Sequence, residues 1–157
     1  MTFSIARATI DDAAAILALQ KLAYQSEAER YGDYSIPPLL QTLEEMRQDL
    51  RSQVVVKAMD DGGAIVASAR AYEENGTAYI GRVIVHPRLQ GQGIGKRVMA
   101  AIEAQFPNTT RFELFTGHLS ERNLHFYHGL GYKDLRTVAV TPSLSFVYFE
   151  KISPVKA

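Results

Sequence analysis

A glycine-rich segment in the middle of the chain has the residue types of a phosphate-binding loop. It comprises Gln90, Gly91, Gln92, Gly93, Ile94, Gly95 and Lys96. An apolar β-branched run ending at Val85 precedes it, and apolar residues at helical spacing follow it from Val98 to Phe106. A helix N-terminus presents unpaired N–H groups and partial positive charge, and glycine lets an anion approach the backbone without meeting a Cβ atom. The segment is therefore predicted to bind a pyrophosphate through its main chain.

Two other phosphate motifs fail on their spacing. A Walker A loop needs a glycine where Gln90 stands and a Ser or Thr directly after Lys96, where the chain has Arg97. The dinucleotide fingerprint needs a third glycine three residues after Gly93, and that position is Lys96. An NAD-linked oxidoreductase therefore remains only as a weaker alternative.

Hydrophobic periodicity and turn residues place the elements that position this loop. Strands are predicted over residues 3–8, 53–59, 64–72, 77–85, 111–116, 132–140 and 146–152. Helices are predicted over residues 9–24, 39–50, 95–106 and 120–130. Hairpin signals at Asp60-Asp61-Gly62-Gly63 and Asn75-Gly76 make the strands around them antiparallel. The strand, loop, helix and strand from 77 to 116 predict one parallel pair.

Composition limits the class of protein. The 157 residues fit a single domain, and 17 Lys plus Arg balance 17 Asp plus Glu, so no global charge draws the chain to nucleic acid or to a membrane surface. The chain has no Cys, and His125 and His128 at helical spacing are expected to face solvent, so no metal site is predicted. The first residues lack the apolar core of a secretion signal, and no apolar run is long enough to span a bilayer. A soluble, cytoplasmic protein is expected.

Three separated features together resemble the GNAT superfamily of N-acetyltransferases. They are Val85-His86-Pro87, the pattern Gln90-x-x-Gly93-x-Gly95, and the segment from Ser120 to Tyr132. The resemblance implies an α/β GNAT fold over residues 1–157, with a mixed, mostly antiparallel sheet of six to seven strands flanked by about four helices. It also implies acetyl transfer from acetyl-CoA to a primary amine of a small molecule or a protein. Small family members are often dimers, so a homodimer is an open expectation.

The resemblance also assigns the donor site. The pyrophosphate of acetyl-CoA is expected on the glycine-rich segment, and its pantetheine arm along Val83, Ile84 and Val85. Ser120 stands where the family usually has Asn, and Asn123 follows one turn later. Either side chain is a candidate to contact the pantetheine.

The resemblance identifies a residue that protonates the leaving group, but it does not identify the base that deprotonates the amine. Tyr127 matches the tyrosine of the family that protonates the leaving thiolate, and a phenol is almost fully protonated at neutral pH. Several members place a catalytic glutamate where this chain has Tyr79, so His118 is the first candidate for the base and Glu73 the second, with ordered water alone as the alternative. The missing carboxylate also leaves an alternative, a CoA-binding regulatory or interaction module without turnover.

The acceptor is expected near the loop between the first two predicted helices. Tyr31, Asp33 and Tyr34 lie there. A carboxylate and aromatic rings suit a cationic amine. The sequence does not choose among a polyamine, an amino acid, an antibiotic and a protein amine.

Overall fold

A seven-stranded sheet organises the protein. The structure is a computed structural model that describes residues 2–153. The strands, in chain order, are β1 (Ser4–Arg7), β2 (Val54–Met59), β3 (Ile65–Glu74), β4 (Thr77–Val85), β5 (Arg111–Gly117), β6 (Lys133–Thr141) and β7 (Leu144–Ile152). Their order across the sheet is β1-β2-β3-β4-β5-β7-β6, and every neighbouring pair is antiparallel except β4 and β5. The expected mixed, mostly antiparallel sheet is confirmed.

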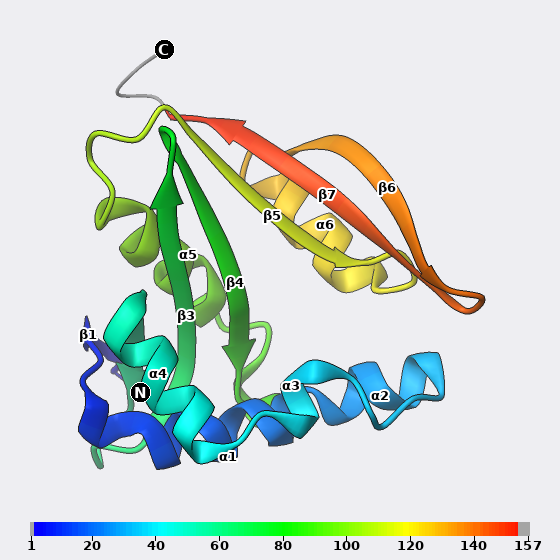
Figure 1. Ribbon diagram of the computed structural model, residues 1–157. Coiled ribbons are helices and arrows are strands. Elements are labelled where there is room, and N and C mark those ends of the chain that lie inside the picture. The colour runs from blue at the N-terminus through cyan, green and yellow to red at the C-terminus, as the bar shows by residue number, and fades with distance from the viewer. Residues whose placement is uncertain (1, 154–157) are drawn as a thin grey trace.

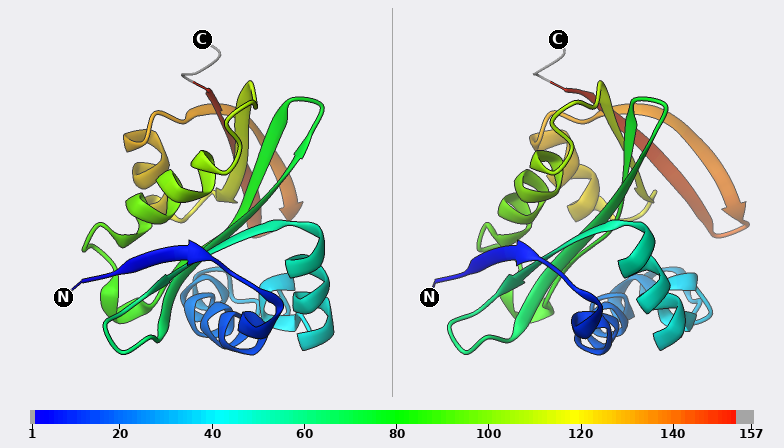
Figure 2. Two further views of the ribbon diagram at one scale, coloured as in Figure 1. Left: turned by 90° about the vertical axis from the view of Figure 1, so that its left-hand side faces the viewer. Right: turned by 60° about the vertical axis from the view of Figure 1, so that its left-hand side comes forward.

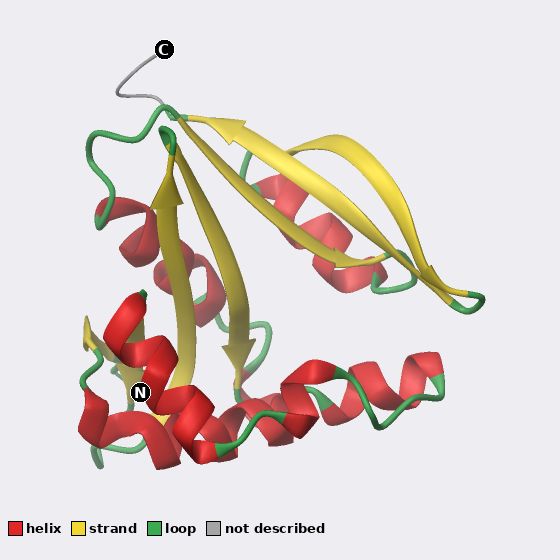
Figure 3. Ribbon diagram, in the orientation of Figure 1, coloured by secondary structure: helices red, strands yellow, loops and turns green. Residues whose placement is uncertain are grey.

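Helices cover both faces of this sheet (Figures 1 and 2). They are α1 (Ala13–Ala23), α2 (Gln25–Tyr31), α3 (Pro37–Leu40), α4 (Leu43–Ser52), α5 (Ile94–Ala104) and α6 (Glu121–Gly129), with short 3-10 turns at Ile10–Asp12 and Pro87–Leu89. Colouring by secondary structure shows the β6–β7 hairpin extending beyond α6 (Figure 3). No helix within residues 2–153 combines the length and the apolar composition that crossing a bilayer requires.

The alternation of side chains along β2 divides the core between two layers. Val55 packs in a cluster with Ile16 of α1 and Met46 of α4, whereas Val56 belongs to the cluster that contains Val98 of α5. Successive residues of a strand point to opposite faces, so one short strand anchors helices on both sides. α1 and α4 therefore share one face of the sheet, and α5 lies on the other.

The predicted turns form where glycine is needed. Asn75 and Gly76 both have positive φ, 52° and 80°, as a two-residue hairpin turn requires. Gly63 at the β2–β3 turn has φ 84°. These turns fix the antiparallel register of β2, β3 and β4, and so determine which residues of β4 approach the glycine-rich segment.

The segment between the first two predicted helices differs from expectation. A loop was predicted after Tyr24, but residues 25–31 form α2 and residues 37–40 form α3. The predicted helix over 39–50 is broken at Gln41, and α4 begins after a Thr42 capping box with Glu45. The two added helices are short, and α2 has a polar sequence with buried Ala28 and Tyr31. Tertiary contact, rather than periodicity, stabilises them.

Candidate functional site

The parallel strands β4 and β5 open into a fork. They pair only where Thr77 to Tyr79 meet Arg111 to Glu113, and beyond that they diverge (Figure 1). The edge of β4 that faces the fork therefore has no strand partner from residue 81 onward among the described residues. Val83, Ile84 and Val85, the residues predicted to lie along a pantetheine arm, border this opening. An extended ligand arm can use the free backbone groups of such an edge.

A bulge in β4 lies beside the fork. Ser68 of β3 pairs with Ile84, but Arg70 pairs with Gly81, so β4 carries one extra residue in this interval. Arg82 lies within the bulge and has φ 49°, a left-handed conformation that is uncommon outside glycine. Val83 lies in the same interval, and Ile84 and Val85 follow it, so the residues expected along the pantetheine arm begin at this irregularity.

The glycine-rich segment joins β4 to α5 with its amides free. Gly91 and Gly93 have φ 80° and 82°, and Gly93 forms the N-cap of α5. Across residues 2–153, no main-chain or side-chain acceptor pairs with the amides of residues 91–96. Gly91, Gln92 and Gly93 are exposed. Free N–H groups at the positive end of an 11-residue helix form an anion-binding arrangement.

α6 closes over one side of this segment. Arg122 donates a hydrogen bond from Nη1 to Oε1 of Gln90 at 2.7 Å, and its Nη2 lies 3.5 Å from the position of a Cβ atom on Gly91. A Cβ atom on Gly95 would lie 3.2 Å from Cζ of Phe126. Arg122 thus brings a guanidinium to the free amides. Arg122 was not predicted from the sequence, because nothing in the spacing of α6 links it to a loop about thirty residues earlier.

Tyr127 lies on α6 with its ring in the core. The residue is 6% exposed and packs against the rings of Phe126 and Phe149, with ring centroids 5.1 and 6.0 Å apart. Burial raises the pKa of Tyr127 above its ordinary value, and the charges of Tyr24 and Glu27 raise it further. Its hydroxyl group has no hydrogen-bond partner among residues 2–153. The phenol is therefore protonated and free to donate.

A carboxylate from α2 reaches the start of α6. Oγ of Ser120 lies 2.7 Å from Oε2 of Glu27, and the hydroxyl group of Tyr31 lies 3.3 Å from the same Oγ. Arg30 also pairs with Glu27 at 3.0 Å. Ser120 is the N-cap residue of α6, but its side chain makes no capping bond and donates to Glu27 instead. The polar segment that contains Glu27 gave no sequence signal for this contact.

Of the residues predicted to bind the acceptor, Tyr31 lies nearest to α6. It is buried, and its hydroxyl group accepts the N–H of Leu119 at 2.9 Å. Asp33 accepts the N–H of Ser35 at 2.8 Å in the turn after α2, and Tyr34 is 58% exposed. The structure brings Tyr31 to the start of α6 and leaves Asp33 and Tyr34 on the surface turn.

The two predicted bases lie in different places. Nδ1 of His118 accepts the N–H of Ser145 at 2.9 Å, so the lone pair of this nitrogen is used by the backbone of β7. Glu73 is exposed near the tip of the β3–β4 hairpin, opposite Ala78 at the start of β4. The glycine-rich segment follows the other end of β4, so Glu73 lies at the far end of this strand from it.

The two candidates for contact with a pantetheine arm both have partners within the protein. Ser120 is 1% exposed and donates to Glu27. Nδ2 of Asn123 donates to Oγ1 of Thr116 on β5 at 3.2 Å. Asn123 is only half-buried and borders β5, one side of the fork.

Comparison with known proteins identifies a family and a fold. Residues 15–132 match the model of the acetyltransferase (GNAT) family. A stretch of 66 residues is 36% identical to the uncharacterized protein YrkN of Bacillus subtilis (strain 168); the match covers 42% of this chain and 34% of that protein.

Solved structures share the whole arrangement. The PaiA N-acetyltransferase of Thermoplasma acidophilum, solved in complex with coenzyme A, superposes with a TM-score of 0.81 at 15% identity, over 98% of this chain and 100% of that one. The ribosomal-protein-S18-alanine N-acetyltransferase of Escherichia coli gives a TM-score of 0.77 at 12% identity, over 96% and 94% of the two chains. At these identities the likeness concerns the fold.

Proposed function

Because the chain belongs to the acetyltransferase (GNAT) family, we propose that it transfers an acetyl group from acetyl-CoA directly to a primary amine. The observation that carries the proposal is the set of free amides at residues 91–96, at the N-terminus of α5 and at the end of the unpaired edge of β4. The coenzyme A bound to the PaiA enzyme is consistent with this donor.

The donor is proposed to bind along β4. The amides of residues 91–96 and the guanidinium of Arg122 would hold the diphosphate, since both offer N–H donors and positive charge at one place. The pantetheine arm would run along Val83 to Val85, with Asn123 more accessible to it than Ser120. The acetyl carbonyl would then lie at the β4 bulge, where a backbone N–H can stabilise the developing oxyanion.

Proton transfer is proposed to involve Tyr127 and Glu27. The amine must lose a proton to attack the thioester carbon, and the C–S bond then breaks to release the CoA thiolate. Glu27 is favoured over His118 and Glu73 as the proton acceptor, because its carboxylate lies at the start of the helix that carries Tyr127, whereas His118 uses Nδ1 in a backbone contact. Tyr127, kept protonated by burial, would give its proton to the thiolate.

The test is release of CoA thiol in the presence of a panel of amines. Amine-dependent thiol release supports acetyl transfer. If the protein binds CoA but releases no thiol with any amine of the panel, a regulatory module is supported instead. Binding is measured by thermal unfolding, since a ligand at a hundred times its Kd stabilises the folded state by about 2.7 kcal/mol. CoA is expected to raise Tm and NAD to leave it unchanged. Absence of a shift with CoA would remove the proposal.

A further inference from the structure

An open groove of about 610 Å³ lies beside the fork, between α3, α4 and the strands β3 and β4. Its wall includes four charged side chains: Arg70, Arg82, Asp49 and Glu45. Arg82 is the residue in the β4 bulge, so the groove begins where the acetyl carbonyl is proposed to lie. A molecule bound in the groove would therefore approach the reaction centre from the side opposite the donor loop.

The carboxylates of the groove already have partners. Asp49 forms an ion pair with Arg70 and accepts a hydrogen bond from Gln41. Glu45 accepts the N–H of Thr42 at 2.9 Å as part of the capping box of α4. Arg82, in contrast, has no ion-pair partner within residues 2–153, and its guanidinium lies over the ring of Tyr24 at 6.0 Å.

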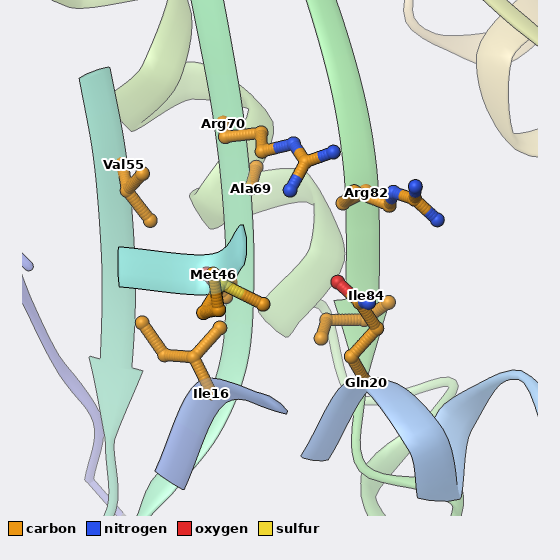
Figure 4. A pocket seen from close by; sticks show the side chains of 9 residues that line it. Ile16, Gln20, Met46, Val55, Ala69, Arg70, Arg82 and Ile84 are labelled. Atoms are coloured by element: carbon orange, nitrogen blue, oxygen red, sulfur yellow. The ribbon is translucent and has the colours of Figure 1, made fainter. Parts of the chain in front are cut away.

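The two arginines of the groove repel one another. Burial lowers the pKa of Arg70, and the charge of Arg82 lowers it further, while Asp49 opposes both effects. Figure 4 shows the two guanidinium groups projecting from neighbouring strands, with the Gln20 amide nearby. Asp49 neutralises one positive charge of this pair. The second remains without an anion at the inner end of the groove.

A buried polar atom lies in a separate small cavity next to both arginines. Oε1 of Gln20 has no hydrogen-bond partner in the described part of the chain, although Gln20 is 1% exposed and its Nε2 donates to both Pro38 and Gln41. It lines a cavity of about 10 Å³, also bounded by Arg70 and Arg82, which is about the size of one water molecule. An amide oxygen only accepts hydrogen bonds, so a donor such as an ordered water in this cavity would satisfy it.

The backbone of Arg82 supports a functional role for its side chain. Its φ of 49° is a conformation that glycine or asparagine adopts at lower cost. Strained residues of this kind persist where the surrounding structure enforces them, and they cluster at binding sites. The bulge that imposes the strain is also what directs the Arg82 guanidinium to the groove and to Tyr24.

We infer that the acceptor amine carries an anionic group, a carboxylate or a phosphate, which binds the guanidinium of Arg82. This inference rests on the proposed acetyl transfer. A guanidinium presents N–H donors in a planar fork that matches both anions. Anion binding at Arg82 would hold the same molecule at the β4 bulge, beside the proposed position of the acetyl carbonyl. Amino acids and aminated phosphate esters are the substrate classes with this chemistry.

The experiment compares matched pairs of amines that differ in the anionic group. Lysine is paired with cadaverine, tyrosine with tyramine, histidine with histamine, and glucosamine 6-phosphate with glucosamine. Thiol release gives kcat/KM for each member. The anionic member of at least one pair is expected to exceed its partner roughly ten- to a hundredfold, the range of a charge-assisted hydrogen-bonded pair. The carboxylate pairs and the phosphate pair together identify the anion.

Three variants connect the preference with Arg82. Arg82→Gln is expected to bring the ratio of kcat/KM between the anionic and the neutral member close to one, and Arg82→Lys to retain part of the preference. Arg47→Gln is the matched control, because Arg47 is a half-buried residue of α4 that pairs with Glu44 and does not line the groove. Equal loss for both members of a pair in Arg82→Gln would contradict anion recognition.

Binding measurements separate this inference from the proposed function. Calorimetry with CoA-loaded protein compares the same pairs in the wild type and in both Arg82 variants, each checked for a native melt. Tighter binding of the anionic member, lost in Arg82→Gln, supports the inference even if no thiol is released. Acetylation of both members at equal kcat/KM would support the proposed acetyl transfer and would contradict anion recognition by Arg82. Equal binding of both members throughout the panel also overturns it.

Discussion

A Cβ atom at Gly117 would lie 2.7 Å from Cζ and 3.0 Å from Cε2 of Tyr31, so β5 requires glycine where this ring packs against it. The Tyr31 hydroxyl group accepts the N–H of Leu119 and approaches Oγ of Ser120, which in turn donates to Glu27. This contact joins the end of β5, the start of α6 and the end of α2. It therefore fixes the position of Glu27 relative to the helix that carries Tyr127.

Replacing Gly117 by alanine is expected to destabilise the fold. The added methyl group must displace the Tyr31 ring or the strand, and overpacking of this kind costs about 1–3 kcal/mol. Urea denaturation measures the loss. Gly129→Ala is the matched control, because a Cβ atom there meets nothing within 4 Å, and alanine in a helix is favoured over glycine by up to about 1 kcal/mol. A Gly117→Ala protein as stable as the wild type would show that the ring moves without cost.

Replacing Gly93 by alanine is expected to weaken CoA binding. Gly93 and Gly63 have nearly the same φ, 82° and 84°, and a Cβ atom meets nothing within 4 Å at either position. Both variants therefore suffer similar backbone strain of about 1–2 kcal/mol. Only Gly93 lies within the segment whose amides are free. We expect a Kd for CoA raised roughly tenfold or more in Gly93→Ala and unchanged in Gly63→Ala, as measured by calorimetry.

Tyr127→Phe tests the assignment of the acid. Loss of the proton donor is expected to lower kcat roughly ten- to a hundredfold with little change in the Kd for CoA. Tyr132→Phe is the matched control, because the Tyr132 hydroxyl group donates to Glu103 at 2.7 Å and serves packing on the same side of the sheet. That variant should lose about 1 kcal/mol of stability and keep kcat. Unchanged turnover in Tyr127→Phe would remove the residue from the mechanism.

Glu27→Gln tests the assignment of the proton acceptor. Glutamine keeps an oxygen for the Ser120 hydroxyl group but cannot take up a proton at neutral pH, so kcat is expected to fall roughly tenfold to a thousandfold. Glu29→Gln, an exposed position on the same helix, is the control and should match the wild type. His118→Ala is measured in parallel. A pH–rate profile that changes in His118→Ala and not in Glu27→Gln would identify His118, rather than Glu27, as the proton acceptor.

Stability at high pH reports the burial of Tyr127. Its pKa is raised above 10.0, so below that pH the phenol is protonated in both the folded and the unfolded chain. Above it the unfolded chain releases this proton while the folded chain keeps it, and folding stability must fall as pH rises. Denaturation from pH 8 to 11 should show a decline, and Tyr127→Phe should decline less steeply, by up to about 1.4 kcal/mol per pH unit. Parallel slopes would mean that the phenol is hydrated.

The sequence predicted those features whose cause is local. The turn at Asn75-Gly76 and the helix that starts after Gly93 depend on residues close in the chain, and both form as expected. The parallel pairing of β4 with β5 was also predicted, because a strand, helix and strand in succession permit little else. α2 was missed because its polar residues show no periodicity, and its burial is created by contact with distant segments.

By itself, then, the chain determined the sheet order around β4, the family resemblance and the exposed glycine loop. These follow from backbone conformations that only certain residues favour. The tertiary structure alone decided that Glu27 contacts Ser120, that Arg122 reaches Gln90, and that Arg82 faces the groove without a carboxylate. Residues separated by thirty to ninety positions meet through packing of the sheet and its helices. The spacing of residues along the sequence does not indicate such contacts.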